Sequence, residues 1–439
     1  MSSKSKGKFK ETEIGIIPED WEVKEMNKIC EVASSKRIFL ADYVAEGIPF
    51  YRSKEIIEKS QGIKISTEIF ISKKKFDEIK EKYGTPQNGD LLLSAVGARS
   101  GIPYYVNEKK EFYFKDGNLI WFRNFKDDIL SKYLYFILVS EIGQNQLENS
   151  MIGSAQPALT IDGLNKLVIP MPPISEQAAI AKILSDLDSR IELNQQMNAT
   201  LEKIGQAIFK HWFINFEFPN EKGKPYKSSG GEMVDSELGE IPKGWKVAKL
   251  GDYGTFKNGI NYLRDETGDA EFFIANVRNI ANNKLLLKNS LDRIKIDLKK
   301  AKDYLLNDKD ILIARSASPG EVSLVLGNLD QVIYSGFSIR YRLNTPNNYL
   351  YMFLIMQRLK ENLSNFAVGT TLQSVNQETL RNMKFVLPLD RALNEFNKII
   401  EQILEETYNN LIQNSSLSQI RDSLLPRLMS GRIRVGMAK

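Results

Sequence analysis

The sequence repeats once over a period of about half its length, and this duplication constrains the fold more than any other feature. The segment EIGIIPEDWEV (13–23) returns as ELGEIPKGWKV (237–247), a shift of 224 positions. Further along, GDLLLS (89–94) returns as KDILIA (309–314) after 220 positions. In the last part of each copy the shift is 216, as small loop deletions would produce. We therefore interpret the chain as a tandem duplication of one large unit rather than a solenoid of short repeats.

Each unit divides into two parts of different composition. The first part, over 1–173 and 235–390, has short apolar runs bounded by glycines, which are typical of strands mixed with helices. The second part, over 174–218 and 391–439, has few prolines and glycines along its helical stretch, and its apolar residues recur three and four positions apart. The sequence predicts an α/β fold class: two tandemly duplicated mixed α/β domains, each followed by a long helix, with an exposed linker at 219–234 between the copies.

Helices are predicted at two places in each copy. Within the mixed domains, Ile129–Asn149 and its copy Pro346–Phe366 are each expected to form one helix. The long helices carry an apolar seam typical of a coiled coil, so each needs a partner along its length. The other copy is the expected partner.

Composition excludes several kinds of chemistry. Cys30 is the only cysteine and His211 the only histidine, so neither an internal disulfide nor a Cys/His zinc site is expected. No secretory signal or membrane-spanning run is present, and a cytoplasmic location is expected. The net charge of +5 permits nucleic-acid binding without demonstrating it.

Two motifs of nucleotide-using enzymes are missing from the sequence. It contains no Gly-x-x-x-x-Gly-Lys-Ser/Thr phosphate loop and no Asn/Asp-Pro-Pro-Tyr/Phe tetrad of an amino-methyltransferase. No catalytic residue, metal or cofactor is therefore expected, and the chain is interpreted as a binding protein rather than an enzyme.

Polar segments that recur in both units are the candidate ligand contacts. The first follows an apolar strand and carries arginine, hydroxyls and glycine, which suit guanine edges, phosphates and close backbone approach, but also suit a hairpin loop that only holds its own turn. The second combines hydroxyls with glutamine, which reads adenine, although Thr160 or Asp162, and Asn376, look like helix N-caps there. The third follows an aromatic residue and suits either a phosphate contact or a solvated strand end. The DNA-contact candidates are Ser94, Arg99, Ser100, Arg315, Ser316 and Ser318 in the first segment; Ser154, Gln156, Thr370, Thr371 and Gln373 in the second; and Arg52, Ser53, Lys54, Asn276, Arg278 and Asn279 in the third.

The order of the motifs resembles the specificity subunits of type I restriction-modification systems, over nearly the whole chain. The resemblance rests on Gly-x-Ile-Pro-x-x-Trp opening each half, KDILIARSASPG (309–320), LVIPMPPISEQ (167–177), and the helix ends LEKIGQAIFKHWF (201–213) and IRDSLLPRLMSG (420–431). The first copy has SAVGAR where TRSG is more usual, so the equivalence of Arg99 and Arg315 is in doubt.

The resemblance implies a recognition subunit within a larger complex. Each α/β domain would read one half of a bipartite, asymmetric site in double-stranded DNA. The two long helices would pack as an antiparallel coiled coil with pseudo-two-fold symmetry and set the half-site spacing. Two methyltransferase subunits and, through them, restriction subunits would bind, and the methyl donor and ATP would belong to those partners. No membrane partner is implied.

Four asparagines interrupt the apolar seam at matching places. Asn194 and Asn198 lie in the first long helix, and Asn410 and Asn414 lie 216 positions later in the second. In an antiparallel pair they would meet near the centre, where a buried amide penalises slipped registers. Alternatively, these side chains point into water.

Other functions stay open at this point. The chain could be the specificity subunit of a related restriction-methylation system. It could also be a nuclease or fused methyltransferase in its own right, or a coiled-coil scaffold that makes no DNA contact.

Overall fold

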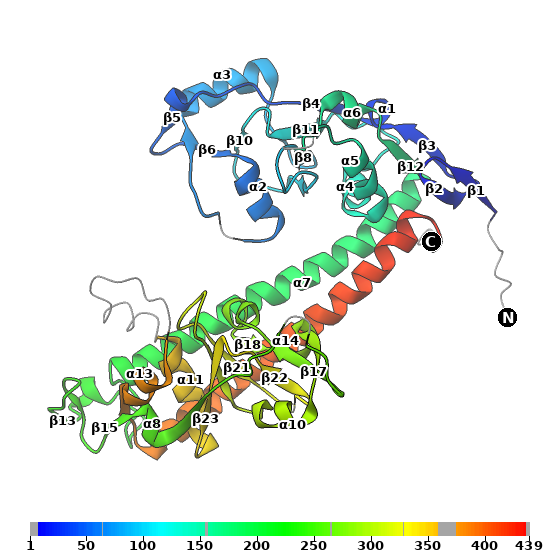
Figure 1. Cartoon of the computed structure of the whole chain (residues 1–439). Coiled ribbons are helices and arrows are strands. Elements are labelled where there is room, and N and C mark those ends of the chain that lie inside the picture. The colour runs from blue at the N-terminus through cyan, green and yellow to red at the C-terminus, as the bar shows by residue number, and fades with distance from the viewer. Residues whose placement is uncertain are drawn as a thin grey trace. The chain divides into compact units, whose positions relative to one another are not determined.

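A computed structural model describes residues 8–63, 65–153, 157–263, 266–327, 329–358 and 375–435 of the chain (Figure 1). The chain separates into two compact units. Unit 1 comprises residues 1–193 together with 413–439, and unit 2 comprises residues 194–412. The candidates Ser154, Gln156, Thr370, Thr371 and Gln373 lie outside the described residues.

Unit 1 is built on two four-stranded sheets. The larger has the order β4 (Glu31–Ala33), β11 (Leu119–Arg123), β8 (Leu91–Ser94) and β9 (Pro103–Tyr105), and all its pairs are antiparallel. The smaller has the order β10 (Tyr113–Phe114), β6 (Ile48–Tyr51), β7 (Phe70–Ile71) and β5 (Tyr43–Val44), with β10 and β6 parallel. The helices around them are α2 (Ser53–Ser60), α3 (Lys73–Tyr83), α4 (Ser131–Val139), α5 (Glu141–Asn149) and α6 (Ile161–Asn165).

Unit 2 repeats this topology with one strand more in the larger sheet and one strand fewer in the smaller sheet. Its larger sheet has the order β16 (Gly254–Asn258), β23 (Ser338–Leu343), β20 (Ile311–Ala314), β21 (Val322–Val325) and β18 (Leu285–Leu286). Its smaller sheet has the order β19 (Asp292–Ile296), β17 (Ala270–Ala275) and β22 (Val332–Tyr334), with β17 and β22 parallel. The helices include α9 (Val277–Asn282), α10 (Leu298–Ala301), α11 (Tyr349–Gln357) and α13 (Gln377–Asn382). The duplication read from the sequence is therefore present in the fold.

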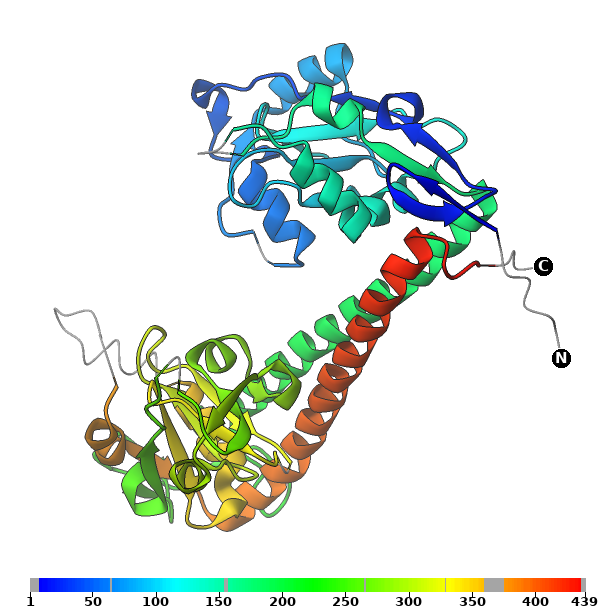
Figure 2. The same cartoon turned by 45° about the vertical axis from the view of Figure 1, so that its right-hand side comes forward.

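Two long helices carry the chain from one unit into the other. The first is α7 (Ile174–Phe209), which continues into a short π-helical turn over Lys210–Ile214, and the second is α14 (Asp390–Met429). In unit 1 the last turns of α14 run antiparallel beside the first turns of α7, where Arg421 donates to Asp188 at 2.9 Å (Figure 2). The predicted fold class, duplicated mixed α/β domains each followed by a long helix, is confirmed.

The predicted helix at Ile129–Asn149 is wrong in one respect, because the structure breaks it in two. Ser140 adopts an extended conformation, with φ −70° and ψ 162°, and ends α4 while capping α5. Its hydroxyl accepts from the backbone N–H of Gly143. Serine hydroxyls favour this capping role over a helix interior, which explains the break. In the copy, α11 covers Tyr349–Gln357, and positions 359–366 lie outside the described residues.

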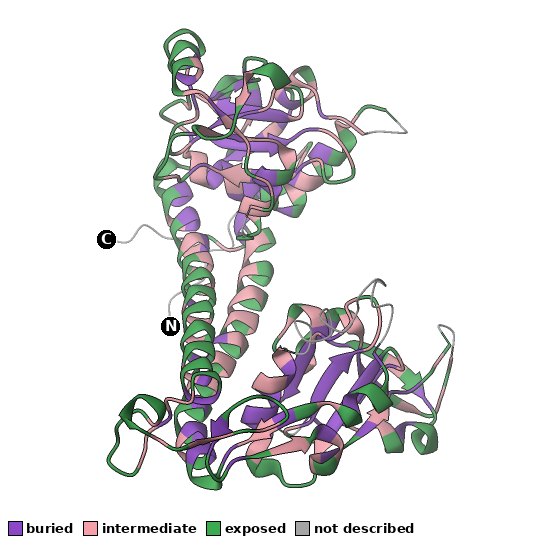
Figure 3. Ribbon diagram, turned by 90° about the vertical axis from the view of Figure 1, so that its left-hand side faces the viewer, coloured by how far each residue is buried: buried purple, intermediate pink, exposed green. Residues whose placement is uncertain are grey.

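The central strands of both units are buried, as Figure 3 shows. The repeated Gly-x-Ile-Pro-x-x-Trp motif fastens each unit to the ends of the long helices. Trp21 is fully buried in the core of unit 1 with Leu428 and Met429 from α14, and Trp245 is buried in the core of unit 2 with Phe213. Each tryptophan N–H closes a turn by donating to the carbonyl of the motif proline three residues earlier. The motif is therefore structural.

The two tryptophans have different neighbours at equivalent places. In unit 1 the Trp21 indole donates to Glu176 at 3.2 Å, and the Arg434 guanidinium forks onto Glu176 at 2.8 and 2.9 Å and onto Asp20 at 2.8 and 2.9 Å. In unit 2 the position of Arg434 is occupied by Phe218, which stacks on Trp245 with ring centroids 4.8 Å apart. Among the described residues, no helix is long and apolar enough to span a membrane.

Candidate nucleic-acid interface

A polar hairpin loop follows the central strand of the larger sheet in each unit, and both loops are closed by the same backbone bonds. In unit 1 the Gly101 N–H donates to the carbonyl of Ser94 at 2.8 Å, directly after β8. In unit 2 the Gly320 N–H donates to the carbonyl of Ala314 at 3.0 Å, directly after β20. The loop of unit 2 is one residue shorter between these closing positions, so the residues inside the two loops are not matched one to one.

The position of Arg315 in unit 2 corresponds to Ala95 in unit 1, not to Arg99. The Ala95 N–H donates to the carbonyl of Asn118 at 2.9 Å, and the Arg315 N–H donates to the carbonyl of Phe337, also at 2.9 Å. Strand register agrees, because the residues just before them, which end β8 and β20, pair with the equivalent positions of β11 and β23. The doubtful equivalence of the two arginines is thus resolved against Arg99.

Residues that follow the second predicted segment in the sequence bond to the same two residues of the hairpin loops. The carbonyl of Ala95 accepts from Leu159 N–H at 2.8 Å, and the carbonyl of Arg315 accepts from Val375 N–H at 3.0 Å. Leu159 and Val375 lie just after the positions that the structure does not describe. The next residues, Thr160 and Asn376, cap α6 and α13 as predicted, and Asp162 does not.

The three candidate side chains of the unit 1 hairpin loop differ in their surroundings. Ser94 is fully buried, and its hydroxyl donates to the carbonyl of Arg99 at 2.6 Å and accepts from Ile102 N–H at 2.9 Å. It therefore stabilises the loop, and its prediction as a DNA contact is wrong because it has no exposed surface. Ser100 faces the sulfur of Met151 at 3.4 Å. Arg99 is exposed, and its guanidinium has no hydrogen-bond or ion-pair partner among the described residues.

The equivalent loop in unit 2 contains an arginine, Arg315, whose side chain forms no hydrogen bond or ion pair within the described residues. Arg315 is half-buried, and over the described ranges its guanidinium has no hydrogen-bond or ion-pair partner. The loop turns sharply because Ser318 N–H donates to the carbonyl of Ser316 at 2.7 Å and Ala317 takes a left-handed conformation with φ 61°. An unpaired arginine beside two half-buried serines is suited to accept a ligand that offers acceptor oxygens or nitrogens.

The third predicted segment begins a helix in each unit, and part of it is structural. Arg52 N–H donates to the Glu55 carboxylate at 2.8 Å, and the guanidinium of Arg52 also binds Glu55, at 2.6 and 3.1 Å. The equivalent backbone bond in unit 2 runs from Asn276 N–H to Asn279 Oδ1 at 2.9 Å. Asn279 is only 5% exposed, so it caps the first turn of α9 and is not a ligand contact. The Glu55 carboxylate also raises the pKa of Arg52.

The outer residues of this segment approach the same turn as the hairpin loop. In unit 1 the Ser53 hydroxyl donates to the carbonyl of Asn118 at 2.8 Å. In unit 2 Asn276 accepts from the Tyr262 hydroxyl at 3.2 Å, and Arg278 forms an ion pair with Asp292. Within the described residues, the Lys54 ammonium has one hydrogen bond, a long one of 3.4 Å to the Thr67 hydroxyl. In unit 2 the Ser335 N–H, two residues before Phe337, donates to the carbonyl of Ala275 at 3.0 Å, next to Asn276. In each unit, therefore, the first and third predicted segments lie at the turn before the last strand of the larger sheet.

The sequence did not single out that turn. In unit 1 it contains Asn118, and in unit 2 it contains Phe337, which is 66% exposed although it is aromatic. We define the recognition edge of unit 1 as Arg52–Lys54, Ala95–Ser100 and Asn118, and that of unit 2 as Asn276–Arg278, Arg315–Ser318 and Phe337. An alignment of the two copies in the region where the shift is about 220 residues would have pointed to the turn that contains Asn118 and Phe337.

The buried carboxylates near the sheets have structural partners. Asp90 accepts from the Trp121 indole at 2.8 Å, and burial raises its pKa. Its copy Asp310 accepts two hydrogen bonds from Arg342, at 2.6 and 2.7 Å. In the described part of the chain, no three His, Cys, Asp or Glu side chains gather closely enough to hold a metal ion. The arrangement offers hydrogen-bond donors and acceptors for binding.

The asparagines of the long helices lie in helix contacts. In unit 2 the Asn410 amide donates to Asn198 Oδ1 at 2.9 Å, and Asn198 donates to a backbone carbonyl of α14 at 3.3 Å. In unit 1 Asn414 donates to the carbonyl of Ile191 at 3.3 Å. Asn194 is fully buried and Asn410 is 5% exposed, so these two side chains do not point into water.

Comparison with known proteins places the chain in a family. The model of the "type I restriction modification DNA specificity domain" matches residues 18–203 and again 242–421. The chain is 30% identical to the MjaIX specificity subunit of Methanocaldococcus jannaschii, covering 97% of this chain and 96% of that one. It is 24% identical to the HindI specificity subunit of Haemophilus influenzae, over 79% and 87% of the two chains.

A solved structure shows the same fold. The S subunit of the type I restriction-modification system of M. genitalium matches with a TM-score of 0.58 and 16% identity, and the match covers 93% of this chain and 96% of that one. Because the family model matches most of the chain in two tandem copies, and a curated relative matches along nearly its whole length, the chain belongs to the specificity subunits of type I restriction-modification systems, the non-catalytic DNA-recognition components of those enzymes.

Proposed function

We propose that each unit reads one half of a bipartite, asymmetric site in double-stranded DNA through its recognition edge. The observation that carries this proposal is that the two edges share one backbone framework but present different side chains. Arg315 stands where unit 1 has Ala95, and Phe337 stands where unit 1 has Asn118. Two readers of different sequences need this combination, because base identity is read by side-chain chemistry on a common scaffold.

We further propose that the long helices act as the spacer between the readers and as the platform for two methyltransferase subunits, through which restriction subunits join. The methyl donor and ATP would be bound by those partners. The asparagine contacts of α7 and α14 support a fixed register, since a slipped helix would leave a buried amide opposite leucine or isoleucine.

The test exchanges one reader. Residues 1–173 are replaced by the first domain of another specificity subunit, and the complex with its methyltransferase partner is expressed in a host without adenine methylation of its own. Methylome sequencing should show one new half-site and one unchanged half-site. The matched control exchanges residues 235–390 and should change the other half only. A change in both halves after a single exchange would contradict modular reading.

The same material separates the remaining alternatives. A nuclease or fused methyltransferase would cleave or methylate DNA as the purified chain with magnesium or methyl donor alone. A scaffold without DNA contact would leave filter binding of DNA the same with and without the chain. A specificity subunit of a related system would give a methylome with a bipartite site but a different kind of partner in the purified complex.

A further inference from the structure

Both units hold an apolar side chain out in solvent at equivalent positions of the loop that follows the first strand of the larger sheet. In unit 1 this is Phe39, which is 63% exposed, follows β4 and lies next to Leu40, which is 82% exposed. In unit 2 it is Leu263, which is 72% exposed and follows β16. The two positions are 224 residues apart, the same shift as the opening motif, so they are copies of one feature. We call these two side chains the apolar tips.

The backbone beneath each tip is fixed in the same way. Phe39 N–H donates to the Asp42 carboxylate at 3.0 Å, and Leu263 N–H donates to the Glu266 carboxylate at 3.0 Å. Both acids stand three residues after the tip. The two copies have kept an apolar tip and an acidic cap at these positions, although the residues themselves differ.

In each unit, a lysine from a neighbouring helix pairs with the acidic side chain that caps the backbone of the apolar tip. Lys75 of α3 lies 3.6 Å from the Asp42 carboxylate, and Lys300 of α10 forms an ion pair with Glu266. The hydrogen bond from Lys300 holds the pKa of Glu266 below its usual value, so this cap is ionised at neutral pH. Each tip is thus presented on a loop that a carboxylate and a lysine hold in place.

The residue before each tip is anchored in the protein. Ile38 is 5% exposed in the core beside the smaller sheet of unit 1, and Tyr262 packs against the core of unit 2. An anchored residue followed by an exposed apolar one directs the tip outward instead of letting it fold back. Leaving a large apolar side chain in water forgoes the stabilisation that burial would give.

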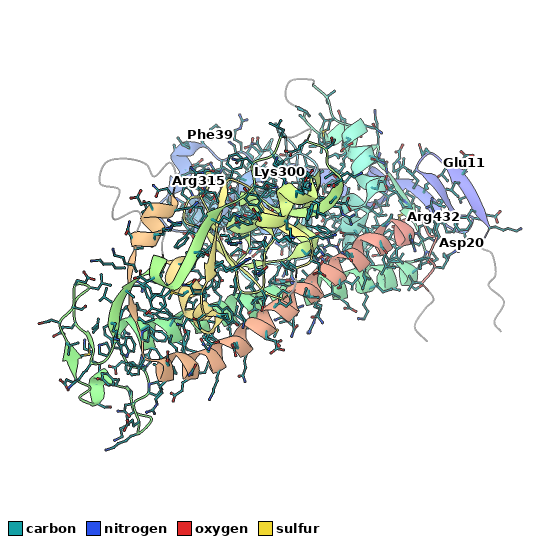
Figure 4. All side chains as sticks on the ribbon, turned by 60° about the horizontal axis from the view of Figure 1, so that its bottom comes forward. Glu11, Asp20, Phe39, Lys300, Arg315 and Arg432 are labelled. Atoms are coloured by element: carbon teal, nitrogen blue, oxygen red, sulfur yellow. The ribbon has the colours of Figure 1, made fainter. Side chains whose placement is uncertain are left out.

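In unit 2 the tip loop adjoins the recognition edge. Gly336 N–H donates to the carbonyl of Ile260 at 2.7 Å, and the Tyr262 hydroxyl reaches Asn276 at 3.2 Å. The residue after Gly336 is the exposed Phe337, which bonds the backbone of Arg315. Figure 4 shows Lys300, the lysine that pairs with Glu266, and Arg315 on the same edge of unit 2.

In unit 1 the same connection is made by different residues. Lys36 N–H donates to the Tyr113 hydroxyl at 2.7 Å, and Arg37 binds Asp116 at 2.9 Å, just before Asn118 of the recognition edge. In Figure 4 Phe39 lies at the opposite end of unit 1 from Glu11, which is on β1 (Phe9–Thr12).

We propose that the apolar tips Phe39 and Leu263 make the non-polar base contact of the two half-sites, each against the bases of its own half, and that they are specificity-determining residues. This inference rests on the proposed function. Proteins that bind duplex DNA use apolar side chains such as phenylalanine and leucine against thymine methyl groups or unstacked base steps.

The test uses the complex of the full chain with its methyltransferase partner. The wild-type methylome first defines the site, and duplexes carrying that site and an unrelated sequence then serve as probes. Phe39→Ala and Leu263→Ala should each weaken binding to the specific duplex by about tenfold, as expected for the loss of a buried apolar side chain. Binding to the unrelated duplex and the slope of affinity against salt should not change, because neither side chain contacts a phosphate.

The controls are apolar residues on other surfaces of the same units. Ile16 is 59% exposed on β2 (Gly15–Pro18), and Leu238 is 46% exposed in unit 2. Ile16→Ala and Leu238→Ala should leave both affinities unchanged, and Phe39→Leu should keep most of the specific affinity. In the methylome, Phe39→Ala should relax base preference in only one half of the site and Leu263→Ala in only the other.

Three outcomes would overturn the inference. Equal losses on specific and unrelated DNA would show a general effect, and unchanged binding by both variants would show that the tips do not touch bases. Loss of the methyltransferase subunit from the purified Phe39→Ala complex, with DNA binding by the chain unaltered, would make the tips protein contacts. A wild-type complex that methylates no bipartite site would instead overturn the proposed function itself.

Discussion

Arg315 in unit 2 and Ala95 in unit 1 occupy the same backbone position, each donating its N–H at 2.9 Å to the turn before the last strand of the larger sheet. The side chain at this position is therefore a cation in one reader and a methyl group in the other. A position whose backbone is held in the same way in both units, but whose side chain differs between them, is suited to set base preference.

If Arg315 forks onto a guanine as proposed, Arg315→Ala should weaken specific binding by about 1–3 kcal/mol, because that contact would be lost, and should leave the salt slope almost unchanged. Filter binding to the specific duplex over a range of salt concentrations measures both quantities. Arg432→Ala is the control, since Arg432 is an exposed arginine outside both recognition edges, and it should leave specific binding unchanged. Even weakening across all sequences would indicate that Arg315 contacts a phosphate.

Asn410→Leu should destabilise the helix pair of unit 2, because it removes the donor to Asn198 Oδ1 and leaves a partly buried acceptor unpaired, at a cost of about 1–3 kcal/mol. Changing both Asn198 and Asn410 to leucine should recover that stability while permitting mixed registers. Urea denaturation reports the first effect, and cysteine cross-linking across the helices reports the second. A double variant that stays in one register would argue against the asparagines as register determinants.

Inserting four residues into both α7 and α14, after Leu193 and after Ile412, should lengthen the nonspecific spacer by one or two base pairs and leave both half-sites intact. The insertion adds about 6 Å to each helix at 1.5 Å per residue. Methylome sequencing reads the spacer directly. An unchanged spacer would show that the helices do not set the distance.

Arg434→Ala should lower the free energy of unfolding by about 2 kcal/mol at neutral pH, because Glu176, which is 7% exposed, loses its charge-assisted bonds. Urea denaturation measures the loss, and Arg432→Ala, an exposed neighbour, is the control and should have little effect.

The contribution of the Arg434 contact to Asp20 also depends on pH. The bond from Arg434 lowers the pKa of Asp20, so its stabilisation is complete above the pKa of the unfolded chain and is lost as the pH falls through the lower folded value. The difference between wild type and Arg434→Ala should be constant from pH 7 to about 5 and narrow below about pH 4. Asp20 is 57% exposed, so this share is less than about 1 kcal/mol. A difference that widened on acidification would contradict the assignment.

The sequence predicted features that depend on local spacing. The duplication, the long helices and the caps at Thr160 and Asn376 all follow from residues a few positions apart or at a constant shift. It missed features that depend on where a loop closes. From the sequence, Arg99 looked like the equivalent of Arg315 in the other copy. The hairpin loops differ in length by one residue between the backbone bonds that close them, and this difference is visible only in the hydrogen bonds of the structure.

Burial could not be read from residue type at the candidate site. Ser94 and Asn279 have the chemistry of ligand contacts, but they face the protein interior, where they hold a turn and cap a helix. The apolar tips had a visible signal, since Phe39 and Leu263 are separated by the same 224 positions as the opening motif and each precedes an acid by three residues. Their exposure became apparent only in the fold.

The division of the chain between the units has a consequence for the order in which a ribosome can complete them. Unit 2 is one continuous stretch, 194–412, and all of it has been synthesised before the last turns of α14 are. The core of unit 1 includes Leu428 and Met429, and its Glu176 binds Arg434. Leu428, Met429 and Arg434 are all translated after the whole of unit 2. The domain that is begun first is therefore finished last, and a transcript cut short before these residues would yield a complete second reader attached to an unfinished first one.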